Sequence, residues 1–198
     1  MGGTTSIVAA LVKLLGELGV EVRLNAPVEE IEVANGKVRA VRLENGERIP
    51  CGTVVSNADP THTYSRLISS RHLRHNTPSR TGRVRQSMSL FVAYFGARTT
   101  YPHLAHHTIV LGERYRGLLD DIFKHRKLAD DFSLYLHAPT RTDPSLAPDG
   151  HEGFYVLSPV PNTRSNVDWD NRKQAYFESI VDRLETRLLP GLGAKLMG

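Results

Sequence analysis

The chain has 198 residues, of which 40% are hydrophobic and 23% are charged, and its formal net charge is +4. This hydrophobic content excludes a disordered chain, and the single cysteine, Cys51, excludes an internal disulfide. No apolar run approaches the ~20 residues needed to cross a bilayer. We therefore expect a cytoplasmic protein, whose mild positive charge permits anionic partners without selecting among them.

The first expected element is an amphipathic helix over residues 7–18. Apolar side chains recur there at helical spacing, at Ile7, Leu11, Leu14, Leu15 and Leu18. Gly19 suits a left-handed residue at the carboxyl end of this helix. No charged leader and cleavage site precede the helix, so we expect no secretory signal.

A β-meander is expected to follow the helix. Its turns are indicated by Asn35-Gly36 and Asn45-Gly46, because Asn-Gly readily adopts the positive φ angles of tight hairpins. Between and around these turns the sequence predicts four strands, at Val20–Leu24, Val28–Val33, Val38–Leu43 and Thr53–Ser56. Polar caps and a proline end the last strand at Asn57-Ala58-Asp59-Pro60.

Residues 61–85 have a different composition. A short helix is predicted over Thr61–Ile68, and a loop-like stretch with many arginines and no acid follows, at Arg66, Arg71, Arg74, Arg80, Arg83 and Arg85. One interpretation is a solvated, mobile segment. The other is a surface for anionic lipid headgroups, at ~1 kcal/mol for each basic residue. No aromatic residues alternate with the arginines, so we do not expect nucleic-acid binding.

The rest of the chain predicts an antiparallel sheet with helices around it, an α+β pattern. Three apolar runs are expected to be strands, at Ser87–Phe95, Phe132–His137 and Phe154–Val160. Helices are expected at residues 112–125 and 170–189, and Pro190-Gly191 ends the second helix.

Two groups of residues could carry polar chemistry. His103, His106 and His107 suggest zinc, but no carboxylate or thiolate lies nearby, and adjacent histidines on a strand point to opposite faces. We therefore expect no metal site. The acidic pairs Asp120-Asp121 and Asp130-Asp131 are expected to be solvated or capping groups rather than catalytic ones.

Several catalytic motifs are absent from the sequence. It contains no G-x-G-x-x-G after a strand, no P-loop, no G-x-S-x-G elbow and no H-E-x-x-H. From residue chemistry alone, the chain is an α/β protein without a recognisable catalytic constellation.

A resemblance goes further. The amino-terminal phrases GGTTSIVAALVKLLGELGVEVRLNAPVEEIEV and VRLENGERIPCGTVVSNADPTHTY resemble flavin-dependent amine-oxidase-like enzymes. The more specific phrases SLFVAYFG, LAHHTIVLGERYRGLLDDIF and DDFSLYLHAPTRTDPSLAPDG resemble bacterial-type phytoene desaturases. The resemblance extends over essentially the whole chain.

The resemblance implies an α/β plus α+β fold. Residues 1–60 would be part of a Rossmann-like FAD-binding domain, and residues 61–198 would be a substrate-binding domain with an antiparallel sheet. The backbone of Val28 would contact the adenine of FAD, and Asn57, Ala58 and Asp59 would lie near the cofactor. We further expect one exposed, apolar face on the meander. Catalytic residues are not identified, and the oligomeric state stays open.

The implied activity is the introduction of double bonds into a long hydrophobic isoprenoid such as phytoene, at a membrane surface, with FAD as hydride acceptor. The dinucleotide-binding fingerprint of that family is missing, so we expect this chain to be an internal fragment that binds FAD weakly or not at all. Alternatives are a non-catalytic lipid- or carotenoid-binding module, or a related carotenoid isomerase or ketolase.

Overall fold

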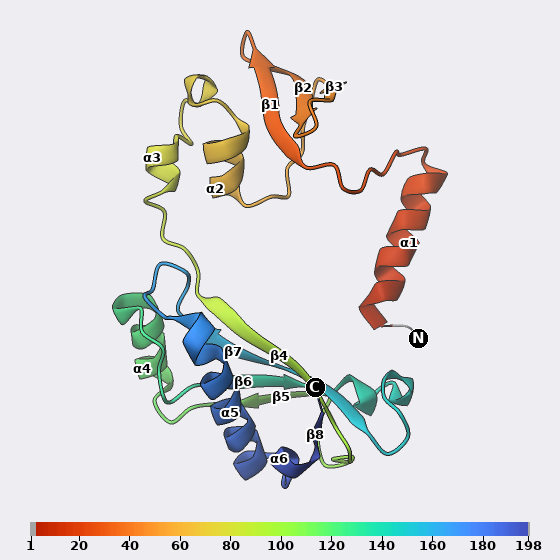
Figure 1. Ribbon diagram of the computed structural model, residues 1–198, viewed down its shortest axis with the longest axis vertical. Helices are drawn as coiled ribbons and strands as arrows, with labels where there is room; N and C mark the ends of the chain where they lie inside the picture. Colours follow the sequence, from red (N-terminus) through yellow and green to blue (C-terminus); the bar gives the residue numbers. More distant parts are fainter. Residues whose placement is uncertain (1–2, 198) are drawn as a thin grey trace. The chain divides into compact units, whose positions relative to one another are not determined.

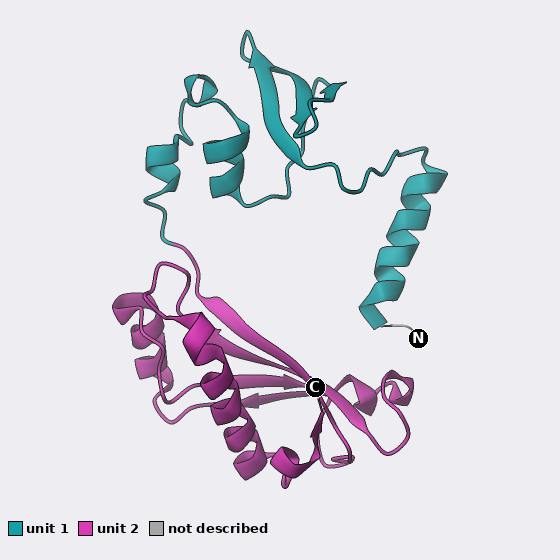
Figure 2. Cartoon of the chain, viewed as in Figure 1, with its two compact units in different colours: residues 1–85 teal, residues 86–198 magenta. Residues whose placement is uncertain are grey.

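A computed structural model describes residues 3–197, and the chain divides into two compact units between Arg85 and Gln86 (Figure 2). Helices and open antiparallel sheets both occur, as the sequence predicts. The assignment of residues 61–85 to a substrate-binding domain concerns function rather than compactness, and it stays a prediction. None of the helices within residues 3–197 is both long and apolar enough to span a membrane.

The first unit begins with helix α1 (Gly3–Glu17), which confirms the predicted amphipathic helix (Figure 1). Gly19 follows it with a φ of +70°, the left-handed conformation expected after a helix. No residue of α1 is buried. Its large apolar side chains are therefore exposed to solvent, with Ile7 at 62% and Leu11 at 55% of their full exposure.

The meander has three strands, in the order β1 (Val28–Ala34), β2 (Lys37–Leu43) and β3 (Arg48–Pro50). Both expected hairpin turns form, and Asn35 and Gly36 have φ angles of +52° and +71°. The predicted strands Val20–Leu24 and Thr53–Ser56 are wrong, because neither segment pairs with a neighbour. Their apolar side chains are left in solvent, with Leu24 at 82% and Val55 at 94% exposure.

The expected apolar, exposed face of the meander is also wrong. Ile31, Ala40 and Leu43 are buried, and the π-helical turn η1 (Thr63–Leu67) packs against β1. Outward-facing positions form ion pairs instead, from Arg42 to Glu29 and Glu30 and from Arg48 to Glu32. The exposed apolar surface of this unit therefore lies mainly on α1.

Short helical turns occupy the rest of the first unit. The predicted helix over 61–68 is present as α2 (Pro60–His62) followed directly by η1. The arginine-rich segment was expected to be a loop, but it contains a 3₁₀ turn, η2 (Ser70–His72), and helix α3 (Pro78–Thr81). All six arginines are exposed on these turns and on the links between them.

The second unit is built on one antiparallel sheet with the strand order β5-β6-β7-β4-β8 (Figure 1). The strands are β4 (Ser89–Ala97), β5 (His107–Val110), β6 (Leu134–His137), β7 (Glu152–Val160) and β8 (Leu196–Met197). Helical elements connect them, namely α4 (Tyr115–Asp120) and η3 (Asp121–His125), η4 (Pro139–Arg141), η5 (Pro144–Leu146), α5 (Trp169–Arg187) and α6 (Leu192–Lys195). The three strands and two helices predicted from apolar periodicity are confirmed, with small shifts at their ends.

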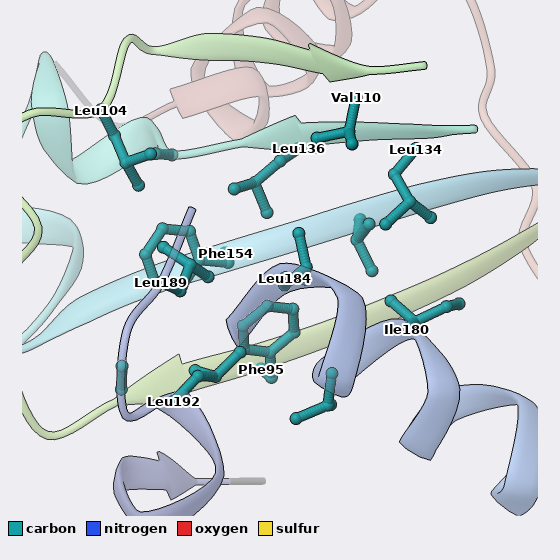
Figure 3. Packing of buried hydrophobic residues seen from close by; sticks show 14 of the residues in the cluster. Phe95, Leu104, Val110, Leu134, Leu136, Phe154, Ile180, Leu184, Leu189 and Leu192 are labelled. Atoms are coloured by element: carbon teal, nitrogen blue, oxygen red, sulfur yellow. The ribbon is translucent and has the colours of Figure 1, made fainter. Parts of the chain in front are cut away.

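Helix α5 covers one face of this sheet. Every second side chain of β7 is buried, and so are Leu134 and Leu136 on β6. These side chains pack against Ile180 and Leu184, both fully buried on α5 (Figure 3). Because strand side chains alternate between faces, the remaining side chains of β4 to β7 are directed to the opposite face, which carries the candidate site.

Candidate functional site: the open face of the second sheet

Two rows of side chains cross the face of the sheet that α5 does not cover. Register pairs of β4 with β7, β7 with β6 and β6 with β5 define both rows. The first row consists of Val92, Leu157, Tyr135 and Ile109, and the second of Tyr94, Tyr155, His137 and His107. Directly opposite residues in adjacent strands lie close enough to contact one another, so each row forms a continuous strip.

This open face is largely apolar and aromatic. Tyr94 keeps 76% of its exposure and Ile109 keeps 68%. Tyr94 stacks obliquely on Tyr155 at 5.7 Å between ring centroids, and Tyr155 lies 4.6 Å from the ring of His137. An exposed patch of this kind on a well-packed sheet is typical of a surface that binds an apolar ligand or another protein surface.

Histidines end the second row. The ring of His107 stacks on that of His137 with centroids 5.1 Å apart and planes 15° apart. His106, immediately before β5, contacts His137 through the two Nε2 atoms at 2.7 Å. His103, which the sequence grouped with these residues, instead contacts the carbonyl of Leu188 at 2.8 Å through Nε2.

The environment disfavours a positive charge on His137. Burial lowers the pKa of His137, and the neighbouring His106 and His107 lower it further. The cause is that a charged imidazolium would be partly removed from water and placed beside two more rings that can become positive. His137 therefore favours its neutral form, and its Nδ1 atom is buried without a hydrogen-bond partner among the described residues.

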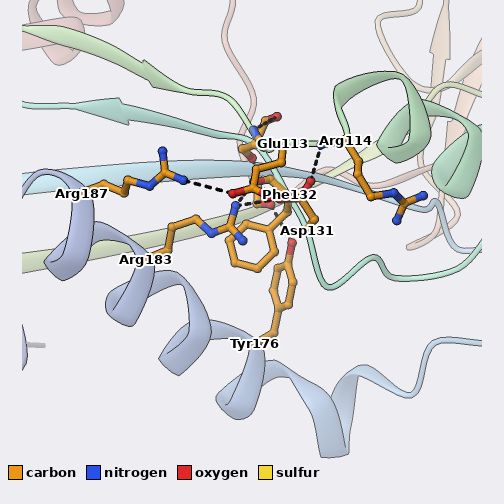
Figure 4. Close-up of polar contacts among 10 residues, drawn as sticks. Glu113, Arg114, Asp131, Phe132, Tyr176, Arg183 and Arg187 are labelled. Atoms are coloured by element: carbon orange, nitrogen blue, oxygen red, sulfur yellow. Dashed lines mark hydrogen bonds and ion pairs between the residues drawn. The ribbon is translucent and has the colours of Figure 1, made fainter.

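The acidic pairs have structural roles. Asp131 accepts a backbone hydrogen bond from Arg114 at 2.6 Å and one from the side chain of Arg183 at 3.0 Å (Figure 4). These bonds hold the pKa of Asp131 below its usual value, with the Arg114 N–H contributing most. Asp121 is not solvated as expected, because its side chain is only 5% exposed and lies 3.2 Å from Lys127 Nζ.

Sequence reasoning missed one buried carboxylate. Glu152 is 3% exposed, accepts the backbone N–H of Tyr101 at 2.8 Å, and lies 3.5 Å from the guanidinium of Arg141. The sequence signal that could have indicated this buried carboxylate is a charged residue at the start of an apolar strand. Both partners fix loops around the sheet, so Glu152 is a structural residue and not part of the open face.

The residues expected near FAD lie in the first unit. Val28 opens β1 with 36% exposure, next to a surface hollow lined by residues 23–27 and by Leu43, Glu44, Asn45 and Glu47. Asn57, Ala58 and Asp59 lie in the link between β3 and α2. Asp59 caps α2 by accepting N–H bonds from Thr61 at 2.8 Å and His62 at 3.2 Å, so its carboxylate already has a local structural role.

Comparison with known proteins identifies the family. Residues 1–190 match the family of flavin containing amine oxidoreductases. The chain belongs to this family. Among curated relatives, it is 46% identical to a phytoene desaturase (lycopene-forming) from Pseudescherichia vulneris over 197 residues, which are 99% of this chain and 40% of that protein. It is 44% identical to a phytoene desaturase (neurosporene-forming) from Cereibacter sphaeroides, covering 99% of this chain and 39% of that one.

Two solved structures share the fold of this chain. An oxidoreductase from Methanosarcina mazei superposes on 98% of the chain with a TM-score of 0.65 at 16% identity. A protein from Pyrococcus furiosus superposes on 93% with a TM-score of 0.66 at 18% identity. In both cases 40% of the solved chain is matched. The chain thus spans about two fifths of the length of the proteins that it matches.

Proposed function

We propose that this chain forms the substrate-binding sheet and part of the FAD site of a phytoene desaturase-like oxidoreductase of carotenoid biosynthesis. The observation that carries this proposal is the match of 99% of the chain to curated phytoene desaturases at 44% and 46% identity. The whole enzyme would introduce double bonds into a long isoprenoid.

The side chains on the open face of the second sheet are suited to binding a polyene substrate. Its two rows each cross four strands, so each row spans roughly 14 Å at the spacing of strands in a sheet. Apolar and aromatic side chains there would bind a hydrocarbon by burial and would exclude water from it. The imidazoles of His107 and His137 lie at one end of this face, and the other polar groups of the two rows are tyrosine hydroxyls, which leaves most of the face suited to a long apolar ligand.

The first unit fits only part of FAD. Val28, at the start of β1 and beside the hollow lined by residues 23–27, could present its backbone to the adenine ring. When bound, FAD supplies the acceptor for the hydride equivalent that leaves the substrate. The sequence holds no glycine-rich loop for the pyrophosphate. We therefore predict weak or absent FAD binding by this chain alone.

A chimaeric enzyme tests the proposal. The chain replaces the matching part of the Pseudescherichia vulneris phytoene desaturase, and flavin absorbance and phytoene conversion are measured. We expect a yellow protein that converts phytoene. A colourless chimaera would contradict the cofactor assignment. Bound carotenoid without conversion would support the non-catalytic binding module, and an isomerised or keto product would support the related activities.

Variants of the chimaera test the open face separately. Val92→Asp and Tyr94→Asp place a charge in the two rows, and we expect each to lower conversion by more than about 10-fold while flavin content is kept. Phe123→Asp, an exposed apolar position on η3, serves as the matched control. Equal losses in all three variants would contradict a role of this face in substrate binding.

We also propose that the arginine-rich segment contacts anionic membrane surfaces, where the substrate would be dissolved. Its six arginines are exposed, and among residues 3–197 no carboxylate forms an ion pair with any of them. The fraction of the chain that sediments with phosphatidylserine vesicles should decrease as the salt concentration rises. Replacing the six arginines by glutamine should abolish it. The control replaces six exposed basic residues elsewhere by glutamine, namely Lys13, Lys37, Arg39, Arg116, Arg172 and Lys173. An equal loss of vesicle binding in this control would contradict a specific role of the arginine-rich segment.

A further inference from the structure

Three imidazoles converge at one end of the open face. The metal-ligating atoms of His106, His107 and His137 all lie within 4.8 Å of one another. They come from the beginning of β5 and the end of β6, which pair so that His107 lies opposite His137. The alternation argument against a metal does not apply, because His106 precedes the strand and its ring reaches His137.

Outer contacts orient two of the three rings. Nδ1 of His107 is 2.6 Å from the hydroxyl of Tyr135, and Nδ1 of His106 is hydrogen-bonded to the hydroxyl of Thr142. Both residues therefore keep Nε2 for another partner. Histidines that bind metals typically have their second ring nitrogen held in this way, which fixes the tautomer and the direction of the ligating atom.

The third ring, His137, contacts His106 through Nε2, the atom that a cation would bind. The Nε2 atoms of His106 and His137 are 2.7 Å apart, so one must donate a proton to the other. In a tetrahedral zinc site, two nitrogens at 2.0–2.1 Å from the ion would be roughly 3.3 Å apart, a small displacement from this arrangement. A cation would take the place of this shared proton, which would move to the Nδ1 atom of the same neutral imidazole.

We infer that His106, His107 and His137 bind a divalent transition-metal ion of the Zn²⁺ type. Three neutral imidazoles form a complete protein ligand set for an open tetrahedral site, whose fourth position is taken by water or a ligand. Carboxylates and thiolates are not required for such a site. Imidazole nitrogens exclude Mg²⁺ and Ca²⁺ as preferred ions, because these prefer oxygen ligands. The site does not depend on the flavin or on the proposed reaction.

Cobalt provides the direct test. The untagged 198-residue chain is titrated with CoCl₂ and followed by visible absorption, then with ZnCl₂ by calorimetry and by displacement of cobalt. We expect one equivalent to bind, with the intense visible bands of tetrahedral cobalt, and zinc to displace it. Zinc should also raise the thermal midpoint of the second unit, followed by the fluorescence of Trp169.

Variants distinguish the cluster from other histidines. His107→Asn, at an exposed position, should abolish the cobalt bands without loss of folding. Tyr135→Phe removes an outer contact and should weaken zinc binding by about 10-fold. His103→Asn and His125→Asn lie outside the cluster and should bind like the parent chain. The inference is overturned by cobalt spectra without tetrahedral bands, by binding that survives His107→Asn, or by equal losses in the two control variants.

Discussion

The guanidinium of Arg183 lies 4.5 Å from the centroid of the Phe132 ring and donates a hydrogen bond of 2.9 Å to the carbonyl of the same residue. It also donates to Asp131 at 3.0 Å, which joins helix α5 to the segment that leads into β6 (Figure 4). One partly buried side chain therefore makes an ion pair, a backbone contact and a cation–π contact at the junction of the helix and the sheet.

Replacing Arg183 should measurably destabilise the second unit. Arg183→Gln removes the charge and the contact with the ring, and we expect the free energy of unfolding to fall by about 2–3 kcal/mol. Urea unfolding followed by Trp169 fluorescence measures this value. Arg187→Gln, one turn further along α5, breaks only an exposed 3.9 Å pair with Glu113 and should change stability by less than about 0.5 kcal/mol. Similar effects of the two substitutions would contradict a special role of Arg183.

Acid should weaken the same junction through Asp131. The pKa of Asp131 is lowered in the folded chain, so its ionised form stabilises the fold at every pH above its ordinary value near 4. That stabilising contribution begins to decrease when the pH falls below about 4, and it is lost as the pH falls through the lowered pKa of Asp131. We expect the stability difference between the parent chain and Asp131→Asn to be largest at pH 7 and to shrink towards pH 2.

Urea unfolding at several pH values between 7 and 2 checks the Asp131 prediction. Asp130→Asn, the exposed neighbour, removes the same formal charge and controls for net charge. A difference between the parent chain and Asp131→Asn that stays constant from pH 7 to pH 2 would contradict the assigned ionisation.

Ser158 and Tyr176 should be energetically coupled. Their hydroxyl oxygens are 2.7 Å apart in the core between β7 and α5, and Ser158 is fully buried. Burial raises the pKa of Tyr176 to about 12, so this pair acts as two neutral hydroxyls at ordinary pH. Tyr176→Phe and Ser158→Ala should each cost about 1–2 kcal/mol, since each removes this hydrogen bond and Ser158→Ala also leaves the buried Tyr176 hydroxyl unsatisfied, whereas Ser158 keeps a longer contact of 3.5 Å to the carbonyl of Ser133.

The double variant Tyr176→Phe/Ser158→Ala isolates the coupling of this pair. It should be less destabilised than the sum of the single changes by about 1 kcal/mol, because the second substitution removes the orphaned hydroxyl. Strict additivity in urea unfolding would show that the hydrogen bond does not contribute.

The sequence predicts elements well where the chain itself supplies the packing partner. Helix α5 and strands β4 and β7 bury periodic apolar residues against one another, so their patterns report a contact that exists in this chain. Val20–Leu24 and Thr53–Ser56 have strand-like composition, but a strand also needs an adjacent backbone to pair with. Composition alone does not say whether that neighbour is present.

The histidine cluster illustrates the same limit at the candidate site. His106 and His107 were recognised from their spacing, whereas His137 lies 31 residues from His106 and joins them only through the pairing of β5 with β6. Strand register is not encoded by local spacing, so no reading of the histidine motif alone could have supplied the third ring. The two rows of the open face also depend on strand register, because each row contains one residue from each of four strands.

A cavity substitution tests whether α5 is the main support of the second sheet. Leu184 is fully buried between α5 and the strands, and Leu184→Ala should lower the free energy of unfolding by about 3 kcal/mol through lost burial and the cavity left behind. Leu111→Ala makes the same chemical change at a side chain that is 58% exposed and should cost less than about 0.5 kcal/mol. Urea unfolding followed by Trp169 fluorescence reports both, since all three residues belong to the second unit. Equal costs for the two leucines would mean that the packing of α5 on the sheet does not determine the stability of this unit.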